Sequence, residues 1–154
     1  MLPGIGPSVP GMTSSRATTG HPHRLVSVRL ITDDVARLAD FYARVTGVPV
    51  RWSTPDFAEL ETSVGTLAVG STRTVALFGA GSARAADNRT AILEFQVDDV
   101  DAEYERLRQV PTEFVNEPTT MPWGNRSLLL RDPDGTLVNL FTTGDPAARA
   151  AFAG

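Results

Sequence analysis

Residues 26–35, VSVRLITDDV, and residues 91–100, AILEFQVDDV, are two copies of one pattern. Each copy begins with alternating apolar and polar residues, as in a strand with one buried face, and ends in a pair of aspartates. Aspartate at such a point caps a helix, because its carboxylate accepts hydrogen bonds from the first free backbone N–H groups. The repeat therefore predicts a strand followed by a helix at two places in the chain.

Helical periodicity follows each aspartate pair, with apolar residues on one face and mostly polar or charged residues between them. The apolar positions are Val35, Leu38, Tyr42 and Val45 in the first copy and Val100, Tyr104 and Leu107 in the second. Gly47 is a suitable C-terminal residue for the first helix, and Pro111 lies just beyond the second. Each pattern therefore predicts a helix of about three turns.

Three shorter strands are expected after each helix. They are residues 48–52, 57–62 and 66–70 in the first copy and residues 113–116, 127–131 and 136–141 in the second. A further short strand is expected at residues 74–78. Residues 132–135, Asp-Pro-Asp-Gly, are expected to form a tight hairpin turn, because proline presets one backbone angle and glycine supplies the positive one.

These elements predict an α+β fold of two repeated βαβββ units, which form a concave mixed sheet around a central cavity with the helices outside. The domain is expected at residues 23–145, with half one at 24–79, a linker at 80–90 and half two at 91–142. Residues 1–22 are rich in Pro, Gly, Ser and Thr and are expected to be a disordered N-terminal tail. Residues 146–154 are expected to be a C-terminal tail.

Composition excludes several functions. The 14 basic and 18 acidic residues give a net charge of −4, which argues against a non-specific nucleic-acid binder. The chain has no cysteine, so it has no disulfide, zinc–thiolate site or cysteine nucleophile, and this fits a reducing cytoplasm. No apolar run approaches the ~20 residues that span a membrane. We therefore expect a cytoplasmic protein without a nucleic-acid or membrane partner.

With this pattern the sequence resembles the vicinal oxygen chelate superfamily, which includes glyoxalases, extradiol dioxygenases and bleomycin-resistance proteins. The resemblance covers about residues 24–142. It implies the paired βαβββ fold, a small-molecule site and a homodimer. The residues that carry it are the two Asp-Asp-Val turns, LADFY at 38–42, MPWGNRS at 121–127 and RDPDGTLVNLF at 131–141.

The resemblance also implies four metal-ligand positions, on the first and last strand of each half. Counting back from Phe41 and from Asp99 places the first-strand positions at Ser27 and Ile92, and aligning residues 65–70 with residues 135–140 places the last-strand positions at Val69 and Asn139. Isoleucine and valine have no lone pair, and a hydroxyl plus one amide oxygen are fewer than the roughly three protein ligands that a catalytic metal needs. We therefore expect no bound metal and no cofactor.

Side chains alternate along a strand, so a cavity that Ser27 and Ile92 face is also faced by Arg29 and Glu94. Leu30 and Phe95 then face the helices. Arg29 and Glu94 are expected to form a buried bidentate pair. One interpretation is a polar anchor for a ligand, or a general base if Glu94 is desolvated. The other is an ion pair that fixes how the halves meet and touches no ligand.

Four other residues are candidates for ligand contact. Asn139 is expected to point inward between Leu137 and Phe141, where it bonds either a ligand carbonyl or its strand neighbours. Trp123 offers a stacking surface at the cavity mouth or else caps the core. Arg126 faces the cavity, unless a shift of one residue in hairpin register turns it outward. The full set of expected ligand-binding residues is Ser27, Arg29, Val69, Ile92, Glu94, Trp123, Arg126, Asn139 and Phe141.

Three functions are compatible with these residues. The favoured one is a metal-free small-molecule-binding protein of the glyoxalase/bleomycin-resistance type that sequesters an antibiotic or a metabolite. The second is a metal-independent lyase or isomerase with Glu94 as general base and Arg29 or Asn139 holding an oxyanion. The third, a metal-dependent dioxygenase or glyoxalase, is the least supported. We also expect a homodimer, because a bare edge strand is a pairing hazard.

Overall fold

The computed structural model describes residues 20 and 22–151, so most of the tail predicted at residues 1–22 lies outside the described residues. The first half contains β1 (Ser27–Thr32), α1 (Val35–Thr46), β2 (Arg51–Thr54), β3 (Phe57–Glu61), β4 (Thr66–Ser71) and α2 (Thr72–Val75). Its sheet has four strands in the order β1-β4-β3-β2, in which β1 is parallel to β4. We call this sheet A.

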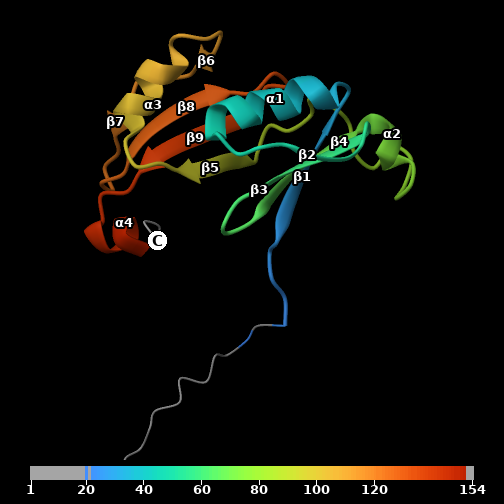
Figure 1. The fold of residues 1–154 in the computed structure, drawn as a ribbon, viewed down its shortest axis with the longest axis horizontal. Helices are drawn as coiled ribbons and strands as arrows, with labels where there is room; N and C mark the ends of the chain where they lie inside the picture. Colours follow the sequence, from blue (N-terminus) through green and yellow to red (C-terminus); the bar gives the residue numbers. More distant parts are fainter. Residues whose placement is uncertain (1–19, 21, 152–154) are drawn as a thin grey trace, which may run out of the picture.

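The second half repeats this plan. It contains β5 (Ile92–Gln96), α3 (Val100–Leu107), β6 (Glu113–Phe114), β7 (Thr119–Thr120), β8 (Arg126–Arg131) and β9 (Leu137–Thr142), followed by α4 (Pro146–Ala151). Sheet B has five strands in the order β5-β9-β8-β6, with β7 pairing β8 and β5 parallel to β9. The predicted α+β fold of two βαβββ units is confirmed, as two open mixed sheets (Figure 1).

The helix caps form as predicted. The Asp34 carboxylate accepts a hydrogen bond from Arg37 N at 3.0 Å, and the Asp99 carboxylate accepts one from Ala102 N at 3.1 Å. Gly47 ends α1 with φ of 73°, a left-handed conformation that glycine adopts without steric cost. The repeated Asp-Asp-Val sequence therefore sets the start of both long helices.

Three elements differ from the prediction. Residues 74–78 were expected as a strand, but they form the end of the short helix α2 and the turn that follows it. The Ser71 hydroxyl accepts from Arg73 N at 2.9 Å, and the Thr74 hydroxyl donates to the Ser71 carbonyl at 2.7 Å, so local side-chain bonds turn the chain. Strand β7 was not predicted, and α4 begins inside the segment expected as a C-terminal tail.

One hydrophobic core joins the two halves. Helix α1 packs on β3 and β4, and α3 packs on β8 and β9. Burying each large apolar side chain contributes roughly 1.5–3 kcal/mol, so a shared core strongly favours the two halves packing together. The fully or nearly fully buried members include Leu38, Tyr42, Leu60 and Val69 from half one and Leu107, Leu128, Leu130, Val138 and Leu140 from half two.

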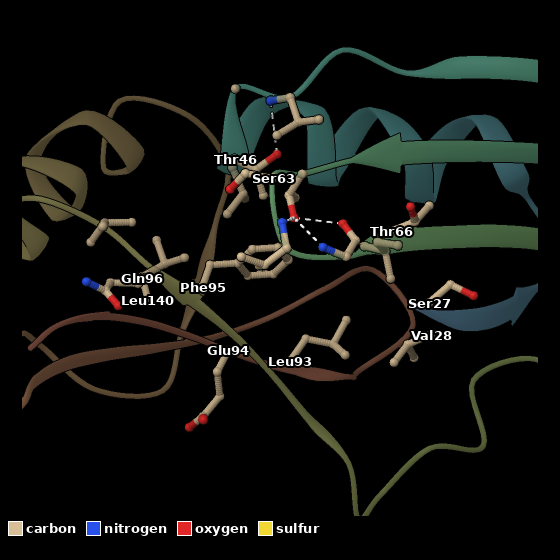
Figure 2. Close-up of a pocket in the computed structure, with 18 of the residues that line it drawn as sticks. Ser27, Val28, Thr46, Ser63, Thr66, Leu93, Glu94, Phe95, Gln96 and Leu140 are labelled. Atoms are coloured by element: carbon tan, nitrogen blue, oxygen red, sulfur yellow. Dashed lines mark hydrogen bonds between the residues drawn. The ribbon is translucent and has the colours of Figure 1, made fainter. Parts of the chain in front are cut away.

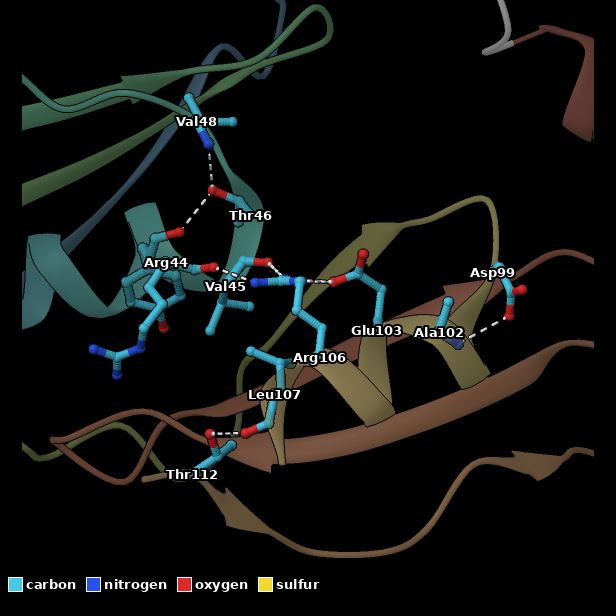
Figure 3. Close-up of polar contacts among 11 residues, drawn as sticks. Arg44, Val45, Thr46, Val48, Asp99, Ala102, Glu103, Arg106, Leu107 and Thr112 are labelled. Carbon is cyan, nitrogen blue, oxygen red and sulfur yellow. Dashed lines mark hydrogen bonds and ion pairs between the residues drawn. The ribbon is translucent and has the colours of Figure 1, made fainter. Parts of the chain in front are cut away.

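A second link joins the helices (Figure 3). The guanidinium of Arg106 on α3 donates to the Arg44 and Val45 carbonyls at 2.8 Å each, and it also pairs with Glu103. The last carbonyls of a helix lack partners within the helix, so this arginine satisfies two of them from the other half. Arg106 thereby fixes α3 against the C-terminal end of α1.

Candidate functional site

A cavity of about 830 Å³ lies between the two halves (Figure 2). Its walls are the start of β1 and the residues before it, the end of α1, the β3–β4 turn, and β5. Ser27, Ile92 and Glu94 are among the lining residues. Small-molecule sites commonly occupy about 300–1,000 Å³, so this volume suits an organic ligand. We call it the inter-half cavity.

The walls of the inter-half cavity are largely apolar. Val28, Leu67, Leu93, Phe95 and Leu140 contribute apolar side chains. The polar groups at the walls include those of Thr46, Thr66 and Gln96. A pocket of this kind favours a ligand with an apolar body and few polar groups.

Cross-strand register shows which way the strand residues point. Leu30 pairs with Val69, and Phe95 pairs with Leu140, and both partners are at most 1% exposed on the helix-covered faces. Alternation therefore puts Arg29 and Glu94 on the opposite, open faces. Both were expected to face the cavity, but only Glu94 is among the residues that line the inter-half cavity. Figure 2 shows the Glu94 carboxylate pointing away from the other labelled side chains of the cavity.

Val69 was expected to contact ligand, and the structure corrects this expectation. Its side chain is 0% exposed, on the helix-covered face of sheet A. Arg29 pairs with Ala68, and Glu94 pairs with Asn139, so the counterpart of Asn139 is Ala68. Ala68 lies three residues after Gly65, whereas Asn139 lies four residues after Gly135, so an alignment of the two glycines is one residue out of register. A slip of one residue turns a side chain to the other face of the sheet.

The predicted Arg29–Glu94 pair does not form within this chain. Instead, Asn139 Nδ2 donates to Glu94 Oε1 at 3.1 Å, on the neighbouring strand of sheet B. The Arg29 guanidinium lies 4.9 Å from the ring centroid of Phe57 and 5.2 Å from that of Phe78. Strands β1 and β5 belong to different sheets, so each residue finds its partners within its own half.

Arg126 also differs from its expected position. It pairs with Thr142 across the strands, on the side that carries the buried Leu128 and Leu130, and so points toward α3. There it binds Asp101 through two hydrogen bonds of 2.7 and 2.8 Å, and these hold the pKa of the Asp101 carboxyl below its usual range. Of the two hairpin registers considered from the sequence, the structure has the one that turns Arg126 away from the cavity.

The remaining two candidates lie on exposed or half-buried surface. Trp123 is 73% exposed in the turn between β7 and β8, away from the residues that line the inter-half cavity. Phe141 is half-buried on the open face of sheet B, between Gln96 and Ser127. Neither residue joins Ser27 and Ile92 at the cavity wall.

The donor set does not fit a transition metal. With Ala68 in place of Val69, the four repeat-related positions offer the hydroxyl of Ser27 and the amide of Asn139, and nothing from Ile92 or Ala68. Within residues 20 and 22–151, no group of three or more His, Cys, Asp or Glu side chains is placed to hold a metal ion. Two weak oxygen donors are too few for zinc or iron.

The sequence did not point to the aromatic partners of Arg29. Phe78 follows α2, which was expected as a strand, so its approach to β1 could not be predicted. For Phe57, alternation along β3 was available from the sequence, but its approach to Arg29 also depends on the strand pairing. It shares the face of β3 with Glu59, and Glu59 pairs with Ala68, which in turn pairs with Arg29.

Comparison with known proteins agrees with this fold. The model of the Glyoxalase/Bleomycin resistance protein/Dioxygenase superfamily matches residues 24–140. The uncharacterized protein YraH of Bacillus subtilis (strain 168) is 24% identical over 124 residues, which cover 77% of this chain and 97% of that protein.

Two solved structures are similar in fold. A glyoxalase/bleomycin resistance protein/dioxygenase from Nocardioides has 23% identity and a TM-score of 0.68, covering 84% of this chain and 89% of that chain. A family enzyme of the same description from Burkholderia phytofirmans PsJN has 20% identity and a TM-score of 0.70, covering 79% of this chain and 99% of that chain.

None of the helices in the described residues is long and apolar enough to cross a membrane. The chain belongs to the glyoxalase/bleomycin resistance protein/dioxygenase superfamily.

Proposed function

We propose that the protein binds a small organic molecule in the inter-half cavity without a metal ion, and so sequesters an antibiotic or a metabolite. The observation that carries this proposal is the cavity of about 830 Å³ with largely apolar walls. Binding against such walls is favourable by about 25 cal/mol for each Å² of apolar ligand surface that is removed from water. The poor donor set at the repeat-related positions supports binding without metal.

A second candidate is a metal-independent lyase or isomerase with Glu94 as general base. One observation favours it: Glu94 accepts a hydrogen bond from Asn139 and has no arginine partner within the described residues. A carboxylate without a salt bridge is available to take a proton from a substrate. Turnover that Glu94→Gln abolishes would support this candidate over simple binding.

We include a homodimer in the proposal. Several apolar side chains at the cavity mouth are uncovered: Leu25 is 86%, Val64 73% and Ile92 46% exposed. A second copy that packs there would cover them and close the cavity. Sedimentation equilibrium is expected to give the mass of two chains, and a monomer at high micromolar concentration would contradict this. A cytoplasmic location, suggested by the absence of cysteine, completes the proposal.

The binding proposal is tested by extracting small molecules from the protein purified from its natural source and identifying them by mass spectrometry. One compound is expected at near-stoichiometric amount. Ile92→Arg places a charge at the cavity wall and is expected to abolish its retention. Val115→Arg is the matched control, because Val115 is 49% exposed and does not line the cavity. Equal retention by both variants, or none by the wild type, would contradict the proposal.

A further inference from the structure

Arg29 is unusual among the arginines of the strands. Arg51, Arg126 and Arg131 each face a carboxylate on a neighbouring element. The guanidinium of Arg29, in the middle of β1, makes no hydrogen bond or ion pair with any described residue. Its five N–H donors, on the open face of sheet A, therefore have no acceptor in the part of the chain that the structure describes.

Two phenyl rings hold the Arg29 guanidinium in place. Its carbon lies 4.9 Å from the Phe57 centroid and 5.2 Å from the Phe78 centroid, within the range of cation–π attraction. Gly70 lies beneath the Arg29 side chain. A Cβ added at Gly70 would stand 3.5 Å from Arg29 Cδ and 3.3 Å from the Thr74 hydroxyl oxygen, so glycine leaves the room that this packing uses.

The surface beside this cation is apolar and uncovered. Phe78 is 75% exposed, and Leu77 before it is 82% exposed, on the turn that follows α2. Backbone hydrogen bonds from Phe78 and Gly79 to the Val75 carbonyl fix that turn. An oriented cation next to a fixed apolar wall is complementary to a molecule with an anionic end and an apolar body.

We propose that Arg29, Phe57 and Phe78, here called the Arg29 clamp, bind the carboxylate of an organic ligand whose aromatic or aliphatic body lies against Phe78. A guanidinium held by its stem and by aromatic rings binds a carboxylate through two parallel N–H···O bonds. This inference rests on the proposed function for the ligand being a small organic molecule. It adds that the ligand is an acid and that Arg29 selects it.

Two features of the surroundings favour an anion at the clamp. Ala68, the neighbour of Arg29 on β4, carries no acceptor that could compete for the guanidinium. Glu59 lies one strand further, on β3. It pairs with Arg51, so the negative charge of Glu59 is partly neutralised, although Arg51 also pairs with Glu61. Ser27, which lines the inter-half cavity, is two residues from Arg29 on the same face of β1, roughly 6.6 Å away. One ligand can therefore reach both places.

The test compares two probes of equal shape, 2-naphthoate and its neutral analogue 2-naphthamide, by isothermal titration calorimetry with the full-length protein. The wild type is expected to bind 2-naphthoate about 10-fold more tightly than the amide, since a charge-assisted pair is much stronger than a neutral hydrogen bond. Arg29→Gln is expected to remove the preference. Arg29→Lys keeps the charge without the planar fork and is expected to retain part of it. Phe78→Ala is expected to weaken both probes.

Arg37→Gln is the matched control, because Arg37 is an exposed arginine on α1 outside the clamp. The preference of this variant for 2-naphthoate over 2-naphthamide is expected to equal that of the wild type. Thermal unfolding verifies that each variant is folded. Equal affinity for the two probes, absence of saturable naphthoate binding, or a preference that survives Arg29→Gln would overturn the inference. Dissociation of a dimer by Arg29→Gln without change of preference would also overturn it and assign Arg29 to a contact with a second copy. A retained neutral compound that depends on Ile92 would leave the proposed function standing and refute the clamp.

Discussion

The Tyr42 hydroxyl donates a hydrogen bond to Asp132 Oδ2 at 2.6 Å, and this buried bond joins α1 of half one to the β8–β9 turn of half two. Asp132 Oδ1 accepts two further bonds, from Asp134 N at 2.8 Å and Thr136 N at 2.9 Å. Burial raises the pKa of both Tyr42 and Asp132 above their ordinary values, and the nearby Asp132 charge raises that of Tyr42 further. This pair and the Arg106 link between the helices are polar contacts that join the halves, whereas Arg29 and Glu94 do not pair.

Tyr42→Phe is expected to lower the free energy of unfolding by about 1.5–3 kcal/mol, the usual range for a hydrogen bond to a charged group. The substitution keeps the ring, which contacts Phe41 and Phe95, and removes only the donor to Asp132. Urea unfolding measures the change. Tyr104→Phe is the control. Its free energy of unfolding is expected within about 0.5 kcal/mol of the wild-type value, because the edge-on contact of the Tyr104 ring with Phe114 does not need the hydroxyl. Similar effects of both substitutions would contradict the assignment.

Stability is expected to fall at alkaline pH because of Tyr42. Its pKa in the folded protein is raised above the unfolded value of about 10, so above that pH the unfolded chain loses the proton first. The stability that this group contributes is thus complete below about pH 10 and is lost as pH rises, with a slope approaching 1.4 kcal/mol per unit. The chain has neither lysine nor cysteine to obscure this range.

Urea unfolding between about pH 9 and pH 11 tests the alkaline prediction, with Tyr104→Phe as background so that Tyr42 is the single tyrosine. The added Tyr42→Phe substitution is expected to flatten the profile. Parallel profiles with and without Tyr42 would show that another group governs the alkaline loss.

Arg106→Met is expected to destabilise the protein by about 1–2 kcal/mol, because the Arg44 and Val45 carbonyls lose the donors that reach them from α3. Arg108→Met removes a charge at the C-cap of the same helix. The ion pair of Arg108 with Glu105 is largely exposed, so this substitution is expected to have little effect. Thermal unfolding compares the two variants. An equal loss would mean that helix propensity or net charge, not the link between the halves, determines the result.

The fold was predictable from sequence where its determinants are local. The Asp-Asp-Val repeats encode both N-caps, and alternation correctly assigned Leu30 and Phe95 to the helix-covered faces, because side-chain direction within one strand depends on that strand alone. The strand predicted at residues 74–78 was wrong because Thr74 and Val75 favour a strand, whereas hydrogen bonds involving the Ser71 and Thr74 hydroxyls stabilise a helix.

The site was less predictable because it depends on relationships between strands. The orientation of Arg126 follows from hairpin register, and the separation of Arg29 from Glu94 follows from how two sheets are placed. Neither quantity is encoded in the pattern of a single strand. Val69 was misplaced for the same reason, by an alignment of turns one residue away from the true register.

Arg126→Ala is expected to leave ligand retention unchanged, because the Arg126 guanidinium binds Asp101 on α3 and does not reach the inter-half cavity. Mass spectrometry of the extracted ligand measures this. Lost retention in a variant that keeps the wild-type melting temperature would place Arg126 at the ligand after all.

Elemental analysis of protein prepared without a histidine tag is the sharpest test of whether this chain binds a small molecule without a metal ion. Ser27, Ala68, Ile92 and Asn139 supply one hydroxyl and one amide, so we expect zinc, iron, manganese and nickel at far below one ion per chain. One of these metals at near-stoichiometric amount, lost together with ligand binding or activity on chelation, would contradict it.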